Sequence, residues 1–190
     1  MKKIDNLIEV DGLFCLKDTK VPYSGPVEGE AKGNFKNGIP EGLWEEYSSK
    51  GILLSKTCYK NGVMEGEYNN FYSGGQLKEK GTLIKGKLEG EVLEYYKNGK
   101  LKLKKNYKNN KPEGECKTYY ENGIIKEKRF YLKGKLEGSY YYYYSSGNIW
   151  IENNYKNGLL NGERIVYYEN GKLEKKEQYK NGFNISGSYH

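Results

Sequence analysis

Large apolar residues recur along the chain at every twelfth position. All but one of them are aromatic, and the residues between them show no run with the 3.6-residue period of an amphipathic helix. The positions are Phe35, Tyr47, Tyr59, Phe71, Leu83, Tyr95, Tyr107, Tyr119, Tyr131, Tyr143, Tyr155, Tyr167 and Tyr179. Because short apolar stretches bounded by turn residues are typical of strands, the pattern predicts an all-β fold.

Glycine follows a period of 24 residues, so that each repeat contains two similar halves. One glycine series is Gly51, Gly75, Gly99, Gly123, Gly147 and Gly171; a second is Gly38, Gly62, Gly86, Asn110, Gly134, Gly158 and Gly182. Asn110 supports the second series, because asparagine is the non-glycine residue that best tolerates a positive φ. The Asn-Gly pairs predict type I′ hairpin turns, in which both central residues need a positive φ.

Each repeat therefore predicts two short antiparallel strands, for example at about 43–48 and 52–59. Strands spaced at about 4.8 Å would build about 13 or 14 strands into a sheet roughly 60 Å long. Hydrophobic residues make up only 36% of the chain, too few to pack two sheets face to face. We expect an elongated single-layer antiparallel meander of stacked β-hairpins in 24-residue repeats.

The two ends of the chain fit the repeat less well. Residues 1–34 are expected to form an N-terminal capping hairpin, with its turn at Asp11-Gly12, and a shortened repeat near Tyr23-Ser24-Gly25. Residues 35–190 then form the hairpin repeat array, which ends in a partial repeat. The last strand leaves an edge with which a second copy could pair, so edge-to-edge self-association is an expected property.

The repeat unit resembles that of a known family. Its consensus is Tyr-Lys-Asn-Gly-x-x-Glu-Gly followed by Tyr-Tyr-x-Asn-Gly-x-Leu, over about residues 23–187. This consensus resembles the variant MORN repeat and, more narrowly, is similar to the bacterial YwqK-like antitoxin family. The resemblance implies a hairpin array that acts as an interaction module, with members serving as antitoxin or immunity partners of toxins. Eukaryotic MORN arrays are associated with phospholipids and scaffolding, which supplies an alternative function.

Charge gives limited information about partners. The formal net charge is +7, but lysines are interleaved with glutamates, which favours a solvated surface and no nucleic-acid partner. One column along the sheet is mostly basic: Lys56, Lys80, Lys104, Lys128 and Lys176, with Glu152 interrupting it. This column could bind an anionic phospholipid surface under the alternative function. The other interpretation is a hydrated row that keeps an open sheet soluble, and we favour it.

Residues suited to catalysis or metal binding are scarce. The only histidine, His190, is at the terminus, where we expect a disordered residue, and Cys15, Cys58 and Cys116 form no Cys-x-x-Cys pair. A further series of glutamates keeps the 24-residue period, and a series of equal carboxylates favours turn and surface roles over a catalytic pair. It comprises Glu41, Glu65, Glu89, Glu113 and Glu137. We expect no enzyme, cofactor or metal. Without an apolar leader or spanning segment, a cytoplasmic location is expected.

Aromatic residues are concentrated at one place in the array. Five consecutive tyrosines, 140–144, precede Trp150, whereas other repeats place Glu46, Asn70, Glu94 or Lys117 in the same columns. Tyrosine and tryptophan are enriched at the energetic centres of protein interfaces. The predicted partner-binding residues are Tyr140, Tyr141, Tyr142, Tyr144 and Trp150. The predicted function is protein binding, with a cognate toxin as the partner that the resemblance implies.

Overall fold

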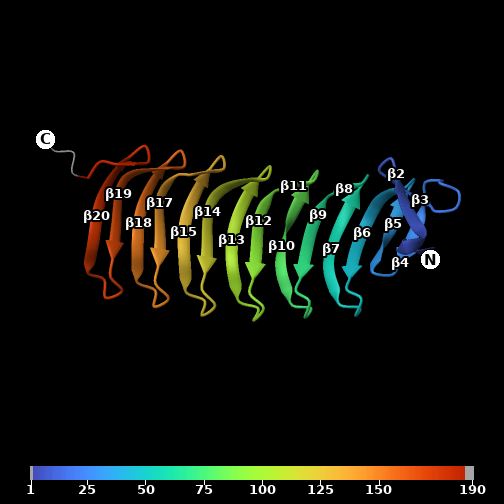
Figure 1. Ribbon diagram of the computed structural model, residues 1–190, viewed down its shortest axis with the longest axis horizontal. Helices are drawn as coiled ribbons and strands as arrows, with labels where there is room; N and C mark the ends of the chain where they lie inside the picture. Colours follow the sequence, from blue (N-terminus) through green and yellow to red (C-terminus); the bar gives the residue numbers. More distant parts are fainter. Residues whose placement is uncertain (1, 187–190) are drawn as a thin grey trace. The chain divides into compact units, whose positions relative to one another are not determined.

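The computed structural model describes residues 2–186, which form β-strands, turns and one three-residue 3-10 helix. Contacts group the chain into two units, one ending at Glu89 and the other beginning at Gly90 (Figure 1). The fold class predicted from the sequence is confirmed: all-β, with mostly antiparallel hairpins in 24-residue repeats that form an open sheet. Within residues 2–186 no helix is both long enough and apolar enough to span a membrane.

The first unit contains eleven strands, most of which pair with their neighbour in the chain. They are β1 Lys2–Lys3, β2 Leu7–Val10, β3 Leu13–Leu16, β4 Gly25–Glu28, β5 Ala31–Lys36, β6 Ile39–Tyr47, β7 Leu53–Lys60, β8 Val63–Met64, β9 Gly66–Phe71, β10 Leu77–Ile84 and β11 Lys87–Leu88. Strand β1 runs parallel to β4, whereas β4 to β10 form antiparallel pairs. Strands β2 and β3 form a separate two-stranded sheet.

The β2–β3 hairpin covers one face of the first strands. Leu7 of this hairpin is buried in a cluster with Val27, Phe35 and Trp44, whose side chains come from β4, β5 and β6. The backbone N–H of Phe14 donates to the carbonyl of Gly38 at 2.8 Å, which fixes the hairpin over the sheet. The hairpin about Asp11-Gly12 is therefore present, and it adds a second layer that the sequence pattern did not predict. The domain boundary at residue 34 stays a prediction.

The second unit contains the remaining ten strands. They are β12 Gly90–Tyr95, β13 Leu101–Lys108, β14 Lys111–Tyr119, β15 Ile125–Leu132, β16 Lys135–Leu136, β17 Gly138–Tyr143, β18 Ile149–Lys156, β19 Leu159–Tyr167, β20 Leu173–Lys180 and β21 Phe183–Asn184. Consecutive long strands pair antiparallel from β12 to β20 (Figure 1). The pairing register shifts at the same point in each hairpin of this unit, just before the last residue of its first long strand. In the β17–β18 hairpin the shift lies between Tyr142 and Tyr143.

The turns have the geometry that the glycine series predicts. Asn157 and Gly158 have φ of 53° and 86°, as a type I′ turn requires. Asn110 in its glycine position has φ of 64°, which confirms that the position demands a positive φ. Lysine also takes this conformation, with φ of 50° at Lys85 and 51° at Lys133.

The recurring glutamates hold these turns in place. The Glu137 carboxylate accepts a hydrogen bond from the backbone N–H of Asn157 at 2.8 Å, and the same bond joins positions 20 residues apart in other repeats. The other pairs are Glu41 with Asn61, Glu65 with Lys85, Glu113 with Lys133, and Asn161 with Asn181. Each carboxylate thus satisfies a backbone donor that the tight turn leaves without a strand partner. This bond explains why glutamate recurs once in each repeat.

Two expectations concern the end of the chain. His190 lies outside the described residues, as does the second half of the partial repeat that begins at Phe183. The short strand β21 pairs antiparallel with β20. Self-association through this edge stays a prediction.

Candidate functional site

The β17–β18 hairpin carries all five aromatic residues singled out from the sequence. Side chains alternate between the two faces of a strand, so Tyr140 and Tyr142 lie on one face and Tyr141 on the other. The register agrees, because Tyr142 pairs with Ile151 and Tyr141 pairs with Glu152. We call the two sides of this unit's sheet the Tyr142 face and the Tyr141 face. The structure therefore divides the predicted site between two surfaces.

An aromatic cluster forms on the Tyr142 face. Trp150 is the extra residue at the register shift between Tyr142 and Tyr143, which turns its ring toward Tyr142. The ring centroids of Tyr142 and Trp150 are 5.3 Å apart in an edge-to-face arrangement. Tyr144 stacks on the same indole, also at 5.3 Å. Trp150 remains 37% exposed, so the cluster of Tyr142, Tyr144 and Trp150 presents aromatic surface to solvent.

Tyr144 also belongs to a series of hydroxyl groups that connects successive repeats. Its hydroxyl donates to the carbonyl of Tyr167 at 2.9 Å, 23 residues further along the chain. The hydroxyls of Tyr96 and Tyr120 donate in the same way to Tyr119 and Tyr143, each at 2.6 Å. The hydroxyl of Tyr144 is thus occupied within the fold, and only its ring contributes to the aromatic cluster.

Tyr140 has a structural position. Its ring lies edge-to-face with that of Tyr155, with the centroids 5.8 Å apart. Burial, together with the nearby carboxylate of Glu127, raises the pKa of Tyr140 to about 12. The phenol is therefore neutral at physiological pH. Its surroundings make Tyr140 part of the packing beneath the cluster.

Polar side chains flank Tyr140 in a row across the strands, and sequence reasoning missed this row. Arg129, Asn153, Arg164 and Glu177 lie on neighbouring strands in the same register as Tyr140, with Asn153 and Glu177 buried. Arg164 Nη1 lies 3.1 Å from the Glu177 carboxylate. Arg129 pairs with Glu127 of its own strand, at 2.5 Å. Arg129, Asn153 and Glu177 occupy equivalent positions of successive repeats. Earlier repeats hold Thr57, Gly81 and Lys105 at that position, so no recurring residue type marks the row in the sequence.

The Tyr141 face combines aromatic and charged side chains. The rings of Tyr141 and Tyr143 lie 6.3 Å apart, and Lys128 pairs with Tyr141 in the register. Burial raises the pKa of Tyr143, with the neighbouring hydroxyl of Tyr141 and the carboxylate of Glu152 acting in the same direction. Tyr141 is thus separated from the Tyr142 cluster by the thickness of the sheet.

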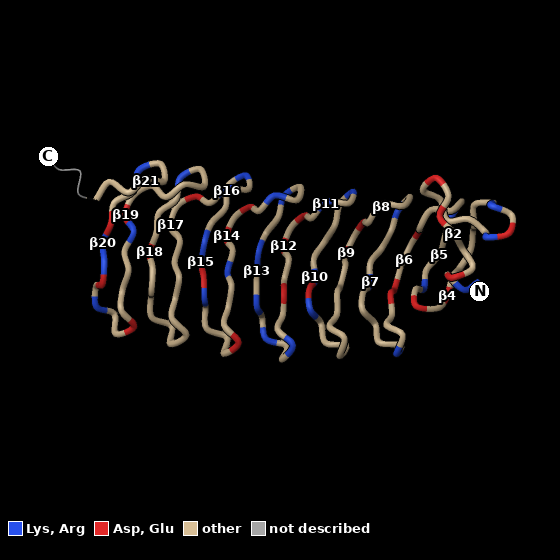
Figure 2. Tube along the Cα trace, viewed as in Figure 1, with Lys and Arg blue, Asp and Glu red and all other residues tan. Residues whose placement is uncertain are grey.

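The lysine column proposed for anionic surfaces is largely paired with carboxylates. Lys56 Nζ lies 3.4 Å from Glu45, Lys104 2.5 Å from Glu91, and Lys128 3.3 Å from Glu115. The hydrogen bond that Lys104 donates to the Glu91 carboxylate raises the pKa of Lys104. Lys80 is exposed. Figure 2 shows basic and acidic residues interspersed along most strands, with a run of basic residues along β13, where Lys102, Lys104, Lys105 and Lys108 have no acidic residue between them.

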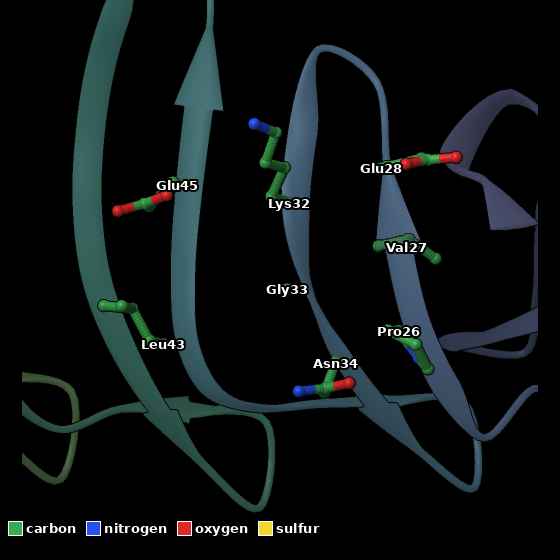
Figure 3. Close-up of a pocket in the computed structure, with 8 residues that line it drawn as sticks. All are labelled: Pro26, Val27, Glu28, Lys32, Gly33, Asn34, Leu43 and Glu45. Carbon is green, nitrogen blue, oxygen red and sulfur yellow. The ribbon is translucent and has the colours of Figure 1, made fainter. Parts of the chain in front are cut away.

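A shallow hollow of about 330 Å³ lies on β4, β5 and β6 of the first unit (Figure 3). Gly33 lies at its centre, between Lys32 and the Leu43–Glu45 side of β6 (Figure 3). The Glu45 carboxylate points toward β7, where it pairs with Lys56 at 3.4 Å. It also accepts a hydrogen bond from the Tyr47 hydroxyl at 2.7 Å, and this bond lowers the pKa of Glu45. The carboxylate of Glu45 is therefore engaged within the fold.

Metal-binding groups are absent from the part of the chain that the structure describes. No three histidine, cysteine, aspartate or glutamate residues within it are grouped so that they could hold a metal ion. The three cysteines are free thiols, with Cys15 and Cys116 buried.

The sequence repeat that forms these hairpins also matches the repeat of a known family. The MORN repeat variant matches six segments, which together cover more than half of the sequence: residues 40–61, 64–85, 88–109, 112–133, 136–157 and 160–181. The chain belongs to the MORN repeat variant family. Each matched segment contains one complete hairpin, and we number the segments as repeats 1 to 6, so that β17 and β18 form repeat 5. No curated protein matches the chain.

Proposed function

We propose that this MORN repeat protein is a non-enzymatic module that binds a protein partner through the cluster of Tyr142, Tyr144 and Trp150. The observation that carries the proposal is the exposed, edge-to-face and stacked arrangement of these rings around Trp150. Aromatic rings fixed by their neighbours lose little conformational freedom on binding, and such residues dominate interface energies. Repeat 5 is also the repeat in which tyrosines occupy both of the columns at positions 141 and 142; several other repeats place polar residues there, such as Glu46, Asn70, Glu94 and Lys117, and repeat 6 places Ile165 and Val166.

The ion pairs between the lysine column and carboxylates favour a protein over a phospholipid surface as the binding partner. A membrane of anionic lipids attracts unneutralised basic groups, at about 1 kcal/mol for each lysine near its surface. Four of the five lysines in the column have a carboxylate within 4 Å. Their net attraction for an anionic surface is correspondingly reduced. Phospholipid binding or scaffolding is therefore the alternative that the experiment below must exclude.

The partner in this proposal is a toxin that the chain neutralises. The similarity of its repeat unit to the bacterial YwqK-like antitoxin family supports this identity. Neutralisation requires only that the module cover or distort an active surface, which agrees with the scarcity of catalytic groups in its described residues. The cytoplasmic location expected from the sequence stays a prediction.

Affinity purification from the native cell, with wild-type and variant chains as bait, tests the proposal. A partner should be recovered with the wild type and lost with Trp150→Ala, because truncating a central aromatic residue weakens an interface by about 2 kcal/mol or more. Phe183→Ala is the matched control, since Phe183 is 75% exposed and lies outside the cluster. Its partner recovery should equal that of the wild type.

Two further measurements separate the alternatives. Expression of the recovered partner alone should stop growth, and co-expression of the wild-type chain should restore it; growth unaffected by the partner would contradict the toxin role. Binding to vesicles of anionic phospholipid that disappears at high salt, together with recovery of no protein, would favour the lipid alternative.

A further inference from the structure

Ion pairs between lysine and glutamate recur on the Tyr141 face. A lysine on one strand meets a glutamate 13 residues earlier on the preceding strand, and the pair repeats every 24 residues. These pairs are Lys104 with Glu91 at 2.5 Å, Lys128 with Glu115 at 3.3 Å, and Lys176 with Glu163 at 2.6 Å. Glu115 also pairs with Lys117 at 2.6 Å, so two lysines of repeat 4 share one carboxylate on this face.

Repeat 5 breaks this pattern at both positions. Glu152 occupies the lysine position, and Ser139 occupies the glutamate position. Within the described chain Glu152 makes no ion pair, because its neighbours across the strands are Tyr141 on one side and Ile165 on the other. The break therefore leaves the Glu152 carboxylate without an ion pair, between the side chains of Tyr141 and Ile165.

Two hollows lie on either side of the Tyr141–Glu152 pair. One has a volume of about 500 Å³ and is lined by Phe130, Ser139 and Tyr141 among others. The other has a volume of about 480 Å³ and is lined by Glu152, Ile149 and Tyr167 among others. The small side chain of Ser139 leaves room for the first hollow, since Glu115 and Glu163 are the larger residues at its position in neighbouring repeats.

Phe130 adds an exposed aromatic side chain to the first hollow, whose lining also includes the charged residues Glu115, Lys128, Arg129 and Glu137. The Phe130 side chain is 46% exposed, although the equivalent positions of the adjoining repeats hold the polar residues Asn106 and Asn154. Phe130 and Tyr141 therefore offer apolar surface beside the carboxylate of Glu152.

A carboxylate next to aromatic rings recognises cations. The carboxylate accepts charge-assisted hydrogen bonds, and the ring faces of Tyr141 and Tyr143 attract the same positive charge. Glu152 is close enough to Tyr143 to influence its titration. The unpaired carboxylate of Glu152 complements a positive charge, so a basic segment of a protein suits this position better than an anionic phospholipid or nucleic acid.

We propose that the Tyr141 face of repeat 5 docks a protein segment that places an arginine or lysine against Glu152 and apolar side chains in the two flanking hollows. This inference rests on the proposed function, because it describes a second contact of the same protein-binding module. The Tyr141 face then binds a basic segment of the partner. The aromatic cluster on the Tyr142 face makes the contact described under the proposed function. Arginine suits the site well, since its guanidinium can bind a carboxylate and stack on a ring at once.

The test converts repeat 5 into the pattern of its neighbours. The double variant Ser139→Glu with Glu152→Lys recreates the ion pair that the other repeats contain, so it should fold with wild-type stability. Glu67→Lys is the control, because it makes the same charge change as Glu152→Lys at an exposed position of the first unit. Thermal unfolding of all three chains establishes that any loss of binding is local.

The probe is a phage-displayed library of random peptides selected on the wild-type chain. Enriched peptides should share an arginine or lysine with apolar neighbours. Synthetic copies should lose at least about tenfold in affinity for the double variant, as expected for a lost hydrogen-bonded charge, and none for Glu67→Lys. Absence of enrichment, enriched peptides without a basic residue, or equal affinity for the double variant would each overturn the inference.

The same variants distinguish this inference from the proposed function. The selected peptides should bind Trp150→Ala as well as the wild type, because Trp150 lies on the opposite face. A cellular partner that is lost with Trp150→Ala but kept by the double variant would leave the proposed function standing and refute the basic docking site. A partner lost with both variants would support two contacts on one module.

Discussion

The series of tyrosine hydroxyls predicts how strongly one repeat stabilises the next. In Tyr120→Phe the ring remains and only the hydroxyl is removed, so the 2.6 Å hydrogen bond to the carbonyl of Tyr143 is lost. Burial raises the pKa of Tyr120, which keeps the hydroxyl protonated as a donor at neutral pH. Removing a partly buried hydrogen bond of this kind costs about 1 kcal/mol. Phenylalanine at this position should therefore lower the free energy of unfolding by that amount.

Urea denaturation followed by circular dichroism measures this loss. Tyr168→Phe is the matched control, because Tyr168 occupies the same column of the last repeat and is 51% exposed. Its unfolding midpoint should stay close to that of the wild type. Combining Tyr96→Phe with Tyr120→Phe should cost about 2 kcal/mol, since positions one repeat apart act almost independently. Wild-type stability in Tyr120→Phe, or an equal loss in Tyr168→Phe, would refute the role of the hydroxyl series.

Three further changes test the turns, the N-terminal core and the buried row by the same denaturation assay. Gly33→Ala should destabilise the chain by about 1–3 kcal/mol, because an added Cβ meets the ring of Trp44; no loss would contradict that packing. Lys133→Asn should stabilise by up to about 1 kcal/mol, since asparagine tolerates the φ of 51° better, and a lower stability would refute this. The hydrogen bond from Lys175 lowers the pKa of Glu177, so its stabilisation is present above about pH 4.3 and is lost on further acidification. Glu177→Gln should therefore be less stable at neutral pH and lose less on acidification; an unchanged pH profile would argue against the pair.

Much of the fold follows from local conformational preferences that can be predicted directly from the sequence. The positive φ at Asn110 is a property of one residue and its turn, so the glycine series predicts it without tertiary information. The strand pattern follows equally from the twelve-residue spacing of residues such as Tyr143 and Tyr155. A repeat sequence strengthens such predictions, because the same residue type recurs at the equivalent position of successive copies.

The features that depend on contacts between distant elements could not be predicted in this way. Leu7 packs against Trp44 only because the β2–β3 hairpin folds over the sheet, and nothing periodic marks that contact. The tyrosine run could be placed on β17, yet the register shift beside Trp150 decides that the indole joins Tyr142 and not Tyr141. The buried pair of Arg164 and Glu177 likewise depends on the register of two strands.

The dissociation constant of the complex with the recovered partner tests the central claim most directly. Isothermal titration of that partner with the wild-type chain and with Trp150→Ala compares the affinity of the intact aromatic cluster with that of the truncated one. If the aromatic cluster of repeat 5 binds the partner, the variant should bind about 30-fold more weakly or worse, equivalent to about 2 kcal/mol. An unchanged dissociation constant for Trp150→Ala would contradict the claim.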